Sequence, residues 1–171
     1  MDDITIISGY VPGAIGRITE MHATYYAANW GLDLYFEAKM ATEVTDFFRD
    51  YQPKRDGAWL ATANGRIIGS ICINGADADG EGARLRWFLI DPAYHGRGLG
   101  HQLLQAAVAF CDQQQFNRVY LTTFAGLDAA RHLYEAHGFS LCGEMSGEAL
   151  TGSANFVEQI FEYFPHAKTT S

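Results

Sequence analysis

Hydrophobic positions in the first fifty residues recur at helical intervals. One stripe of apolar and aromatic residues ends at a glycine: Ile15, Ile18, Met21, Tyr25 and Ala28, before Gly31. A second stripe has a spacing of three to four and ends before a proline: Phe36, Met40, Val44, Phe47 and Tyr51, before Pro53. Because a helix repeats every 3.6 residues, these stripes predict helices over residues 12–31 and 35–51. A short edge strand is expected before them, over residues 4–8.

After residue 57 the apolar positions form short runs, which is the pattern of strands. Two runs, residues 58–63 and 66–74, flank Asn64-Gly65, and this dipeptide between two such runs predicts a β-hairpin. Further elements are expected along the rest of the chain: strands at 84–90, 118–124, 141–145 and 156–163, and helices at 99–115 and 128–137. This order is typical of an α/β domain with a mixed sheet. We expect one domain over residues 1–164 and a loose C-terminal tail over residues 165–171.

Composition places the chain among ordinary soluble globular proteins, because 48% of its 171 residues are hydrophobic and 19% are charged. No apolar run approaches the ~20 residues of a membrane-spanning helix, and the first residues lack the basic and apolar segments of a secretory signal. The three cysteines, Cys72, Cys111 and Cys142, are widely spaced and odd in number. We therefore expect a cytoplasmic protein with buried, reduced thiols, and with no disulfide framework, zinc site or membrane contact.

Net charge narrows the possible partners. Twelve basic and twenty acidic residues give a formal net charge of −8. Such a chain repels the phosphates of nucleic acid, so we expect no nucleic-acid partner. The balance suits a cationic small molecule, or a neutral cofactor that is bound at a local site.

The most informative stretch is a glycine-rich turn that joins a strand to a helix. The strand at 84–90 leads to Gly96, Gly98 and Gly100, where the next helix begins. Glycines let a backbone approach an anion closely, and the free N–H groups and positive dipole at a helix N-terminus attract phosphate oxygens. This turn is therefore a candidate cradle for a pyrophosphate, to which Arg97 can add a charge-assisted contact.

Two other phosphate-binding motifs do not match this turn. A dinucleotide-binding motif needs a third glycine where the chain has His101, and a nucleotide P-loop needs a lysine and a hydroxyl where it has His101-Gln102. A turn whose glycines only let the strand and the helix pack together remains the alternative.

Two segments resemble signatures of one enzyme family. Residues 95–100, His-Gly-Arg-Gly-Leu-Gly, resemble the acetyl-CoA pyrophosphate loop, R/Q-x-x-G-x-G/A, of the GNAT-type N-acetyltransferases. Residues 130–139, Ala-Arg-His-Leu-Tyr-Glu-Ala-His-Gly-Phe, are similar to the second signature of that family, A-x-x-L-Y-x-x-x-G-F. The resemblance extends over residues 4–163, and it departs at His95, where the family usually has arginine or glutamine.

The resemblance implies a fold and a place within the family. The implied fold is a single GNAT-like α/β domain with a mixed, mostly antiparallel sheet of six to seven strands. About four helices flank this sheet, which is splayed between the fourth and fifth strands. Residues His22, Tyr25, Tyr26, Phe36 and Glu37 look like the acetyltransferase domain that is often fused to a MarR-type DNA-binding module. We expect that the domain stands alone here, without that module, and the habit of the family implies a homodimer.

The resemblance also implies a reaction, in which acetyl moves from acetyl-CoA to a primary amine of a small molecule in a ternary complex, without a metal. Tyr134 matches the family position whose hydroxyl faces the cofactor sulfur, which implies a general acid. Without the resemblance, Tyr134 is better explained as a packing tyrosine on an amphipathic helix. The implied cofactor-binding residues are in the strand and the loop: Phe88, Leu89, Ile90, His95, Gly96, Arg97, Gly98, Leu99, Gly100 and His101.

The acceptor pocket is implied to lie at the first two helices. Its implied lining is mostly aromatic: His22, Tyr25, Tyr26, Trp30 and Phe36. Glu37 is the preferred base for the amine and His22 is the second choice, although a solvated helix surface is the better explanation for any single carboxylate. Arg84 and Arg86 are either surface residues or contacts to an acidic part of the substrate. A sensor domain that binds acyl-CoA without catalysis is the competing function.

Overall fold

The structure, a computed structural model, describes residues 2–165 and contains one seven-stranded sheet in the order β1-β2-β3-β4-β5-β7-β6. The strands are β1 (Ile4–Ser8), β2 (Gly57–Ala63), β3 (Arg66–Asn74), β4 (Ala83–Ile90), β5 (Val119–Phe124), β6 (Ser140–Ser146) and β7 (Val157–Tyr163). The α-helices are α1 (Ala14–Trp30), α2 (Leu34–Arg49), α3 (Leu99–Gln114), α4 (Asp128–Ala136) and α5 (Glu148–Thr151). The predicted α/β fold with a mixed sheet is confirmed.

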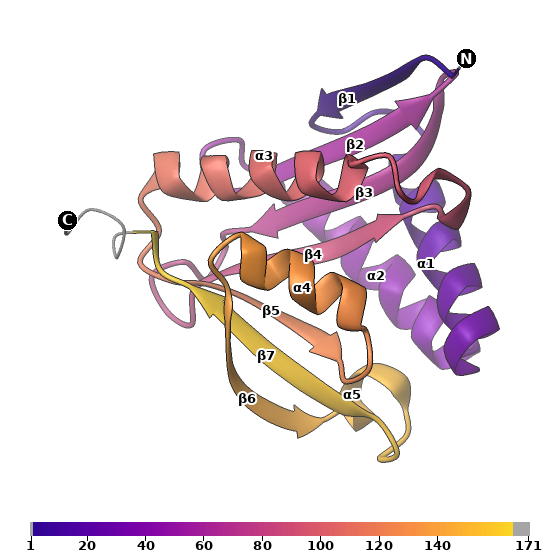
Figure 1. Ribbon diagram of the computed structural model, residues 1–171, viewed down its shortest axis with the longest axis vertical. Helices are drawn as coiled ribbons and strands as arrows, with labels where there is room; N and C mark the ends of the chain where they lie inside the picture. Colours follow the sequence, from indigo (N-terminus) through magenta and orange to yellow (C-terminus); the bar gives the residue numbers. More distant parts are fainter. Residues whose placement is uncertain (1, 166–171) are drawn as a thin grey trace.

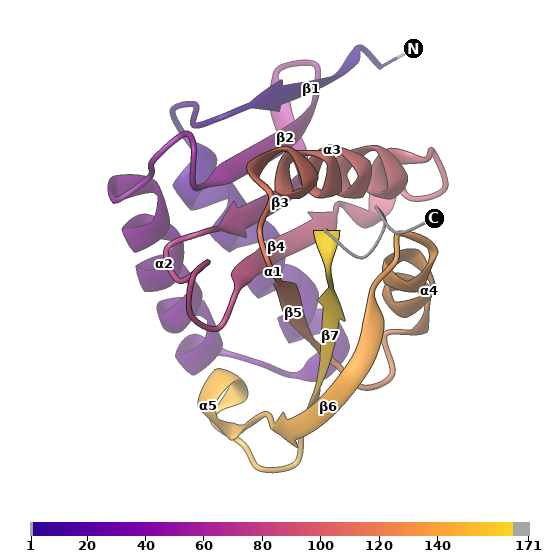
Figure 2. The ribbon, with the colours of Figure 1, turned by 90° about the vertical axis from the view of Figure 1, so that its left-hand side faces the viewer.

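Helices cover both faces of the sheet (Figures 1 and 2). α1 and α2 lie on one face, and α3 and α4 lie on the other. Ile18 and Val44 are fully buried on the first face, and Leu103 and Leu104 are fully buried on the second. Each large side chain that is removed from water contributes about 1.5–3 kcal/mol to stability, so the sheet is held between two hydrophobic layers.

The sheet opens between β4 and β5, as the resemblance implied. These strands are parallel and pair through only two positions, Ala83 with Val119 and Arg84 with Tyr120. Beyond Arg84 the two strands separate, and Figure 1 shows them diverging toward the glycine-rich turn. We call this opening the seam. Its edges carry backbone groups that are available to a ligand, because neither strand completes the ladder of the other.

A β-bulge distorts β4 beside the seam. The register between β3 and β4 shifts between Ser70 and Cys72, and Trp87 has a φ of +51°. The Ser70 hydroxyl donates a 2.6 Å hydrogen bond to the Trp87 carbonyl oxygen, which fixes the bulge. A positive φ in a bulky residue costs about 1–3 kcal/mol, and such strain clusters at functional sites.

Two features of the structure depart from the sequence predictions. The short helix α5 was not predicted, because four residues are too few to show a stripe. Cys142 is exposed on the edge strand β6, so the prediction of buried thiols is wrong there, whereas Cys72 and Cys111 are buried and all three are free. The predicted tail lies outside the described residues except for Pro165, which is buried. Within residues 2–165, no helix has both the length and the apolar character to cross a bilayer.

Candidate active site

A cavity of about 700 Å³ lies beside the glycine-rich turn, and we call it the cofactor cavity. The end of β4, the turn and α4 contribute most of its walls. Its volume is within the range of about 300–1,000 Å³ that small-molecule sites occupy. It is therefore large enough to enclose a substantial part of a coenzyme.

The turn is shaped to hold an anion. Gly96 and Gly98 both have a φ of +77°, and a Cβ added at either position would meet nothing within 4 Å. Gly98 caps α3 without a side-chain hydrogen bond, so the first N–H groups of the helix have no acceptor within the helix or its cap. These N–H groups and the positive end of the helix dipole favour a diphosphate, which fits the pyrophosphate of acetyl-CoA.

Most of the predicted cofactor residues line this cavity: Phe88, Leu89, Ile90, His95, Gly96, Gly98, Leu99, Gly100 and His101. His95 hydrogen-bonds through Nε2 to the Ile90 carbonyl oxygen at 2.9 Å, so its ring braces the end of β4. Arg97 does not reach the cavity, because its Nη1 lies 3.1 Å from Asp2 Oδ2 and its guanidinium stacks on Tyr94. The geometry therefore lends no support to a cofactor contact from Arg97.

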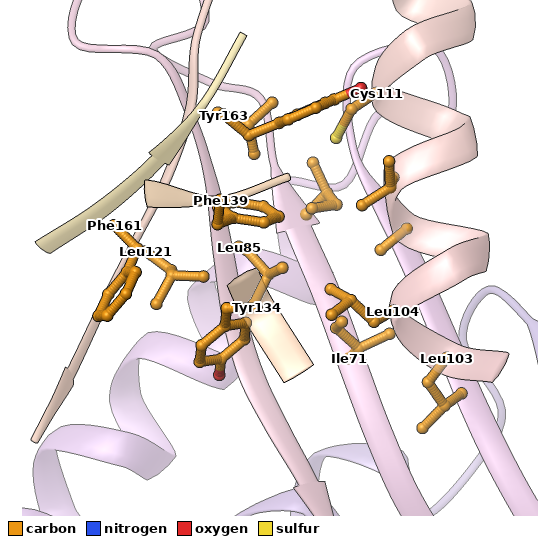
Figure 3. Packing of buried hydrophobic residues seen from close by; sticks show 14 of the residues in the cluster. Ile71, Leu85, Leu103, Leu104, Cys111, Leu121, Tyr134, Phe139, Phe161 and Tyr163 are labelled. Atoms are coloured by element: carbon orange, nitrogen blue, oxygen red, sulfur yellow. The ribbon is translucent and has the colours of Figure 1, made fainter. Parts of the chain in front are cut away.

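Tyr134 occupies a central position between two cavities. Its ring is buried and packs 6.1 Å from the rings of Phe139 and Phe161, and Figure 3 shows its hydroxyl directed away from Phe139. Within residues 2–165 the hydroxyl makes no hydrogen bond. Burial, with a smaller contribution from Tyr26, raises the pKa of Tyr134, so the phenol keeps its proton at neutral pH. The core packing and a proton-donor role are thus compatible.

The second cavity, of about 100 Å³, lies between α1, α2 and the seam, and we call it the acceptor cavity. Apolar and aromatic side chains form much of its wall: Tyr26, Phe36, Met40, Phe124 and Leu150. Its polar side chains come mainly from the two strands of the seam: Arg84, Arg86, Thr122 and Thr123, with His22 from α1. Phe88 and Tyr134 line both cavities, so the two cavities are adjacent at these residues.

The structure brings only some of the predicted acceptor residues together. His22, Tyr26 and Phe36 line the acceptor cavity, whereas Tyr25 lines the cofactor cavity. Trp30 lines neither cavity, and its ring packs 6.0 Å from that of Phe124.

Glu37, the preferred base, is exposed and lines neither cavity. Its neighbour Phe36 is buried, and adjacent residues of a helix point about 100° apart. The solvated helix surface therefore describes Glu37 better than catalysis does.

His22 is a buried, neutral imidazole. Its Nδ1 lies 2.8 Å from the Ile18 carbonyl oxygen, to which it donates, and its buried Nε2 has no hydrogen-bond partner among the described residues. Burial lowers the pKa of His22 to about 4, although the bond to Ile18 opposes this shift. A group with such a low pKa is a weak base for an ammonium, whose pKa is near ~10.

We expect His22 to make the fold sensitive to mild acid. The unfolded chain protonates this imidazole below its ordinary pKa of 6.5, whereas the folded protein keeps it neutral down to about pH 4. The contribution of neutral His22 to the free energy of unfolding is therefore present above pH 6.5 and is lost as the pH falls toward 4. The free energy of unfolding should fall by about 2 kcal/mol between pH 7 and pH 5. Urea unfolding at both pH values measures this loss. The loss should shrink by that amount in His22→Gln and persist in His132→Gln, which removes an exposed histidine. Equal losses in both variants would contradict the assignment.

Sequence reasoning missed a charged cluster and two structural elements at the site. Arg86 pairs with Glu43, which also holds Lys39 at 2.6 Å. Leu150, from the unpredicted α5, lines the acceptor cavity. Lys39 and Glu43 have the spacing of a helical ion pair, so the sequence could have predicted this pair. The residues near Trp87 show no pattern that predicts a bulge.

Comparison with known proteins agrees with this geometry. Residues 17–139 match the acetyltransferase (GNAT) family. N-acetylaspartate synthetase of Danio rerio is 27% identical over 143 residues, which are 82% of this chain and 50% of that protein. Spermine/spermidine N(1)-acetyltransferase of Bacillus subtilis (strain 168) is 34% identical over 73 residues, which are 40% of this chain and 47% of that one. The chain thus spans about half the length of the curated relatives that it matches.

Solved structures show the same fold. The crystal structure of a GNAT-family acetyltransferase from Staphylococcus aureus Mu50 has a TM-score of 0.74 and 19% sequence identity, and the match covers 95% of this chain and 99% of that one. The family match extends over most of the chain and includes both the glycine-rich turn and Tyr134. The chain therefore belongs to the GNAT acetyltransferase family.

Proposed function

We propose that the protein is an N-acetyltransferase that moves acetyl from acetyl-CoA to a primary amine by direct transfer in a ternary complex. One observation carries the proposal: Phe88 and Tyr134 line both the cofactor cavity and the acceptor cavity. A thioester bound in the first space can then meet an amine bound in the second, beside a buried phenol. Close approach of two oriented reactants is itself a large part of catalysis.

The proposed reaction forms one C–N bond and breaks one C–S bond. The amine nitrogen attacks the thioester carbonyl carbon, and the sulfur leaves with the electron pair of the C–S bond. Backbone N–H groups next to the Trp87 bulge stabilise the negative charge that develops on the carbonyl oxygen. Tyr134, whose pKa burial raises, donates its proton to the departing sulfur, and the proton that the attacking nitrogen then loses restores the phenol.

The amine needs to lose its proton without a carboxylate at the preferred position. Glu37 lies on the surface, and His22 is a weak base. We propose that solvent takes the proton before attack, so that only the neutral amine enters the reaction. The rate should then increase with pH above neutrality, in proportion to the neutral fraction of an amine with a pKa near ~10.

Acetyl-CoA is expected to stabilise the fold strongly. At ~100 times its Kd the ligand contributes about 2.7 kcal/mol, which raises the Tm by roughly 5–10 °C. A thermal-shift titration measures this, with NAD as a control ligand whose binding motif the turn lacks. An unchanged Tm would rule out both the enzyme and the sensor. A shift without thiol release for any amine would favour the sensor, and thiol release with an amine would exclude it.

A further inference from the structure

We infer that the acceptor is an amino acid, a carboxylate of which is held by Arg84 while its amine faces Tyr134. This inference rests on the proposed function and adds the chemical class of the acceptor. The sequence alone leaves two roles for Arg84 and Arg86, surface residues or contacts to an acidic substrate. Both arginines are only partly exposed and line the acceptor cavity, which favours the second role.

Arg84 carries a positive charge that the protein leaves unpaired. Among residues 2–165, no carboxylate lies within ion-pair distance of its guanidinium. Its Nη2 donates one hydrogen bond to Thr122 Oγ1 at 3.3 Å, and the guanidinium lies 5.9 Å from the centre of the Tyr120 ring. Because a guanidinium has five N–H donors in a planar fork, most of these donors are available to a ligand.

The surroundings of Arg84 favour a negatively charged ligand. Burial, and then the like charge of Arg86, lowers the pKa of Arg84, while Tyr120, Glu43 and Glu158 oppose the shift. A partly buried charge is unfavourable unless an opposite charge pairs with it. A carboxylate that enters the cavity supplies this pair, and its two oxygens match the fork of the guanidinium.

The nearby carboxylates do not cancel the positive charge. Glu43 is shared between Arg86 and Lys39. Burial alone would raise the pKa of Glu43, but Arg86 and Lys39 together lower it, so this carboxylate stays ionised and engaged. Glu158 acts on Arg84 only from beyond ion-pair distance. Three cations against two carboxylates leave the cluster with a net positive charge.

The position of Arg84 orients the acceptor. Arg84 lies where β4 and β5 still pair, at the closed end of the seam, whereas Phe88 and Tyr134 lie where the two cavities are adjacent. An acceptor held at Arg84 by its carboxylate therefore directs its other end toward the thioester. The acceptor cavity, at about 100 Å³, is well below the range of about 300–1,000 Å³ for larger ligands. A compact amino acid suits it better than a polyamine, whose ammonium groups the two arginines repel.

The first test compares amino acids with matched amines that lack the carboxylate. Thiol release from acetyl-CoA is measured for the twenty amino acids, for ethylamine and phenethylamine as partners of L-alanine and L-phenylalanine, for L-aspartate diamide, and for spermidine. We expect at least one amino acid to exceed every amine without a carboxylate by about tenfold or more in kcat/KM. Equal or faster acetylation of such an amine, spermidine included, would overturn the inference.

The second test changes the guanidinium. Arg84→Gln should raise the KM for the amino acid by about ten- to hundredfold, and should change the KM for acetyl-CoA little. Arg84→Lys should restore part of the affinity, because it keeps the charge and loses the fork. Arg66→Gln removes a side chain that is 67% exposed on β3 and should change nothing. An unchanged KM for the amino acid in Arg84→Gln would contradict the assignment.

A binding measurement separates this inference from the proposed function. Calorimetry with CoA-saturated protein reports amino-acid binding whether or not transfer occurs. If no amine is acetylated but amino acids bind, and Arg84→Gln abolishes this binding, then carboxylate recognition is supported and the transferase proposal fails. If amino acids bind no better than ethylamine, the inference fails, whatever the catalytic result.

Discussion

Tyr134→Phe is expected to lower kcat by about 10²–10³-fold while the Kd for acetyl-CoA stays within about twofold. The substitution removes one hydroxyl that makes no hydrogen bond within residues 2–165, and it leaves the buried ring in place. Stability should therefore change little, whereas the departing sulfur loses its proton donor. Single-turnover thiol release gives the chemical step, and the thermal shift gives the binding.

A second buried tyrosine of the same hydrophobic cluster supplies the control. Tyr163 donates a 2.7 Å hydrogen bond to Asp112, away from both cavities. Tyr163→Phe should lower stability and leave kcat unchanged. If Tyr134→Phe kept the wild-type kcat, or if both variants lost activity to the same extent, the proton-donor role would be refuted.

Gly98→Asp is expected to weaken acetyl-CoA binding by at least about a hundredfold. Gly98 has a φ of +77°, and a side chain there would meet nothing within 4 Å, so the new carboxylate points into open space beside the loop. Aspartate is one of the few residues other than glycine that adopt left-handed backbone, so α3 should still form. The repulsion between its charge and each phosphate charge is on the order of 1–4 kcal/mol at ~4 Å.

Gly98→Asn separates charge from shape. Asparagine has nearly the same size and the same tolerance for this backbone conformation, but it carries no charge. Its Kd for acetyl-CoA, measured by calorimetry, should stay within about tenfold of the wild-type value. Equal Kd values for the aspartate and asparagine variants would mean that the loop does not hold the diphosphate.

The fold was readable from the sequence because most of its elements bury one regular stripe. α2 was predicted over residues 35–51 and is found at Leu34–Arg49, since Phe36, Met40, Val44 and Phe47 are all buried. The glycine-rich turn was readable for a different reason, because backbone N–H groups at a helix start make an anion site whatever the side chains are. Both predictions were possible because the residues that determine these elements are close together in the sequence.

The acceptor side was harder to predict because distant segments build it. Arg86, which lines the acceptor cavity, pairs with Glu43, which is 43 residues away in sequence, and no local pattern predicts that pair. The net charge of −8 suggested a cationic ligand. Arg84 and Arg86 nevertheless line the acceptor cavity, because the fold, and not the net charge, determines which charged side chains face the cavity. The net charge of the chain determines its long-range attraction for ligands, whereas recognition at a binding site depends on the few charged side chains that line it.

The short ladder between β4 and β5 links the two binding events. Two residue pairs clamp one end of the seam, and just before them a Cβ at Gly82 would lie only 2.8 Å from the Arg118 carbonyl oxygen. The strands on either side are therefore joined at this end and diverge toward the opposite end, where Phe88 and Tyr134 line both cavities. If a ligand in one cavity changes how far the strands diverge, thermodynamic linkage requires that each ligand changes the affinity for the other by the same factor.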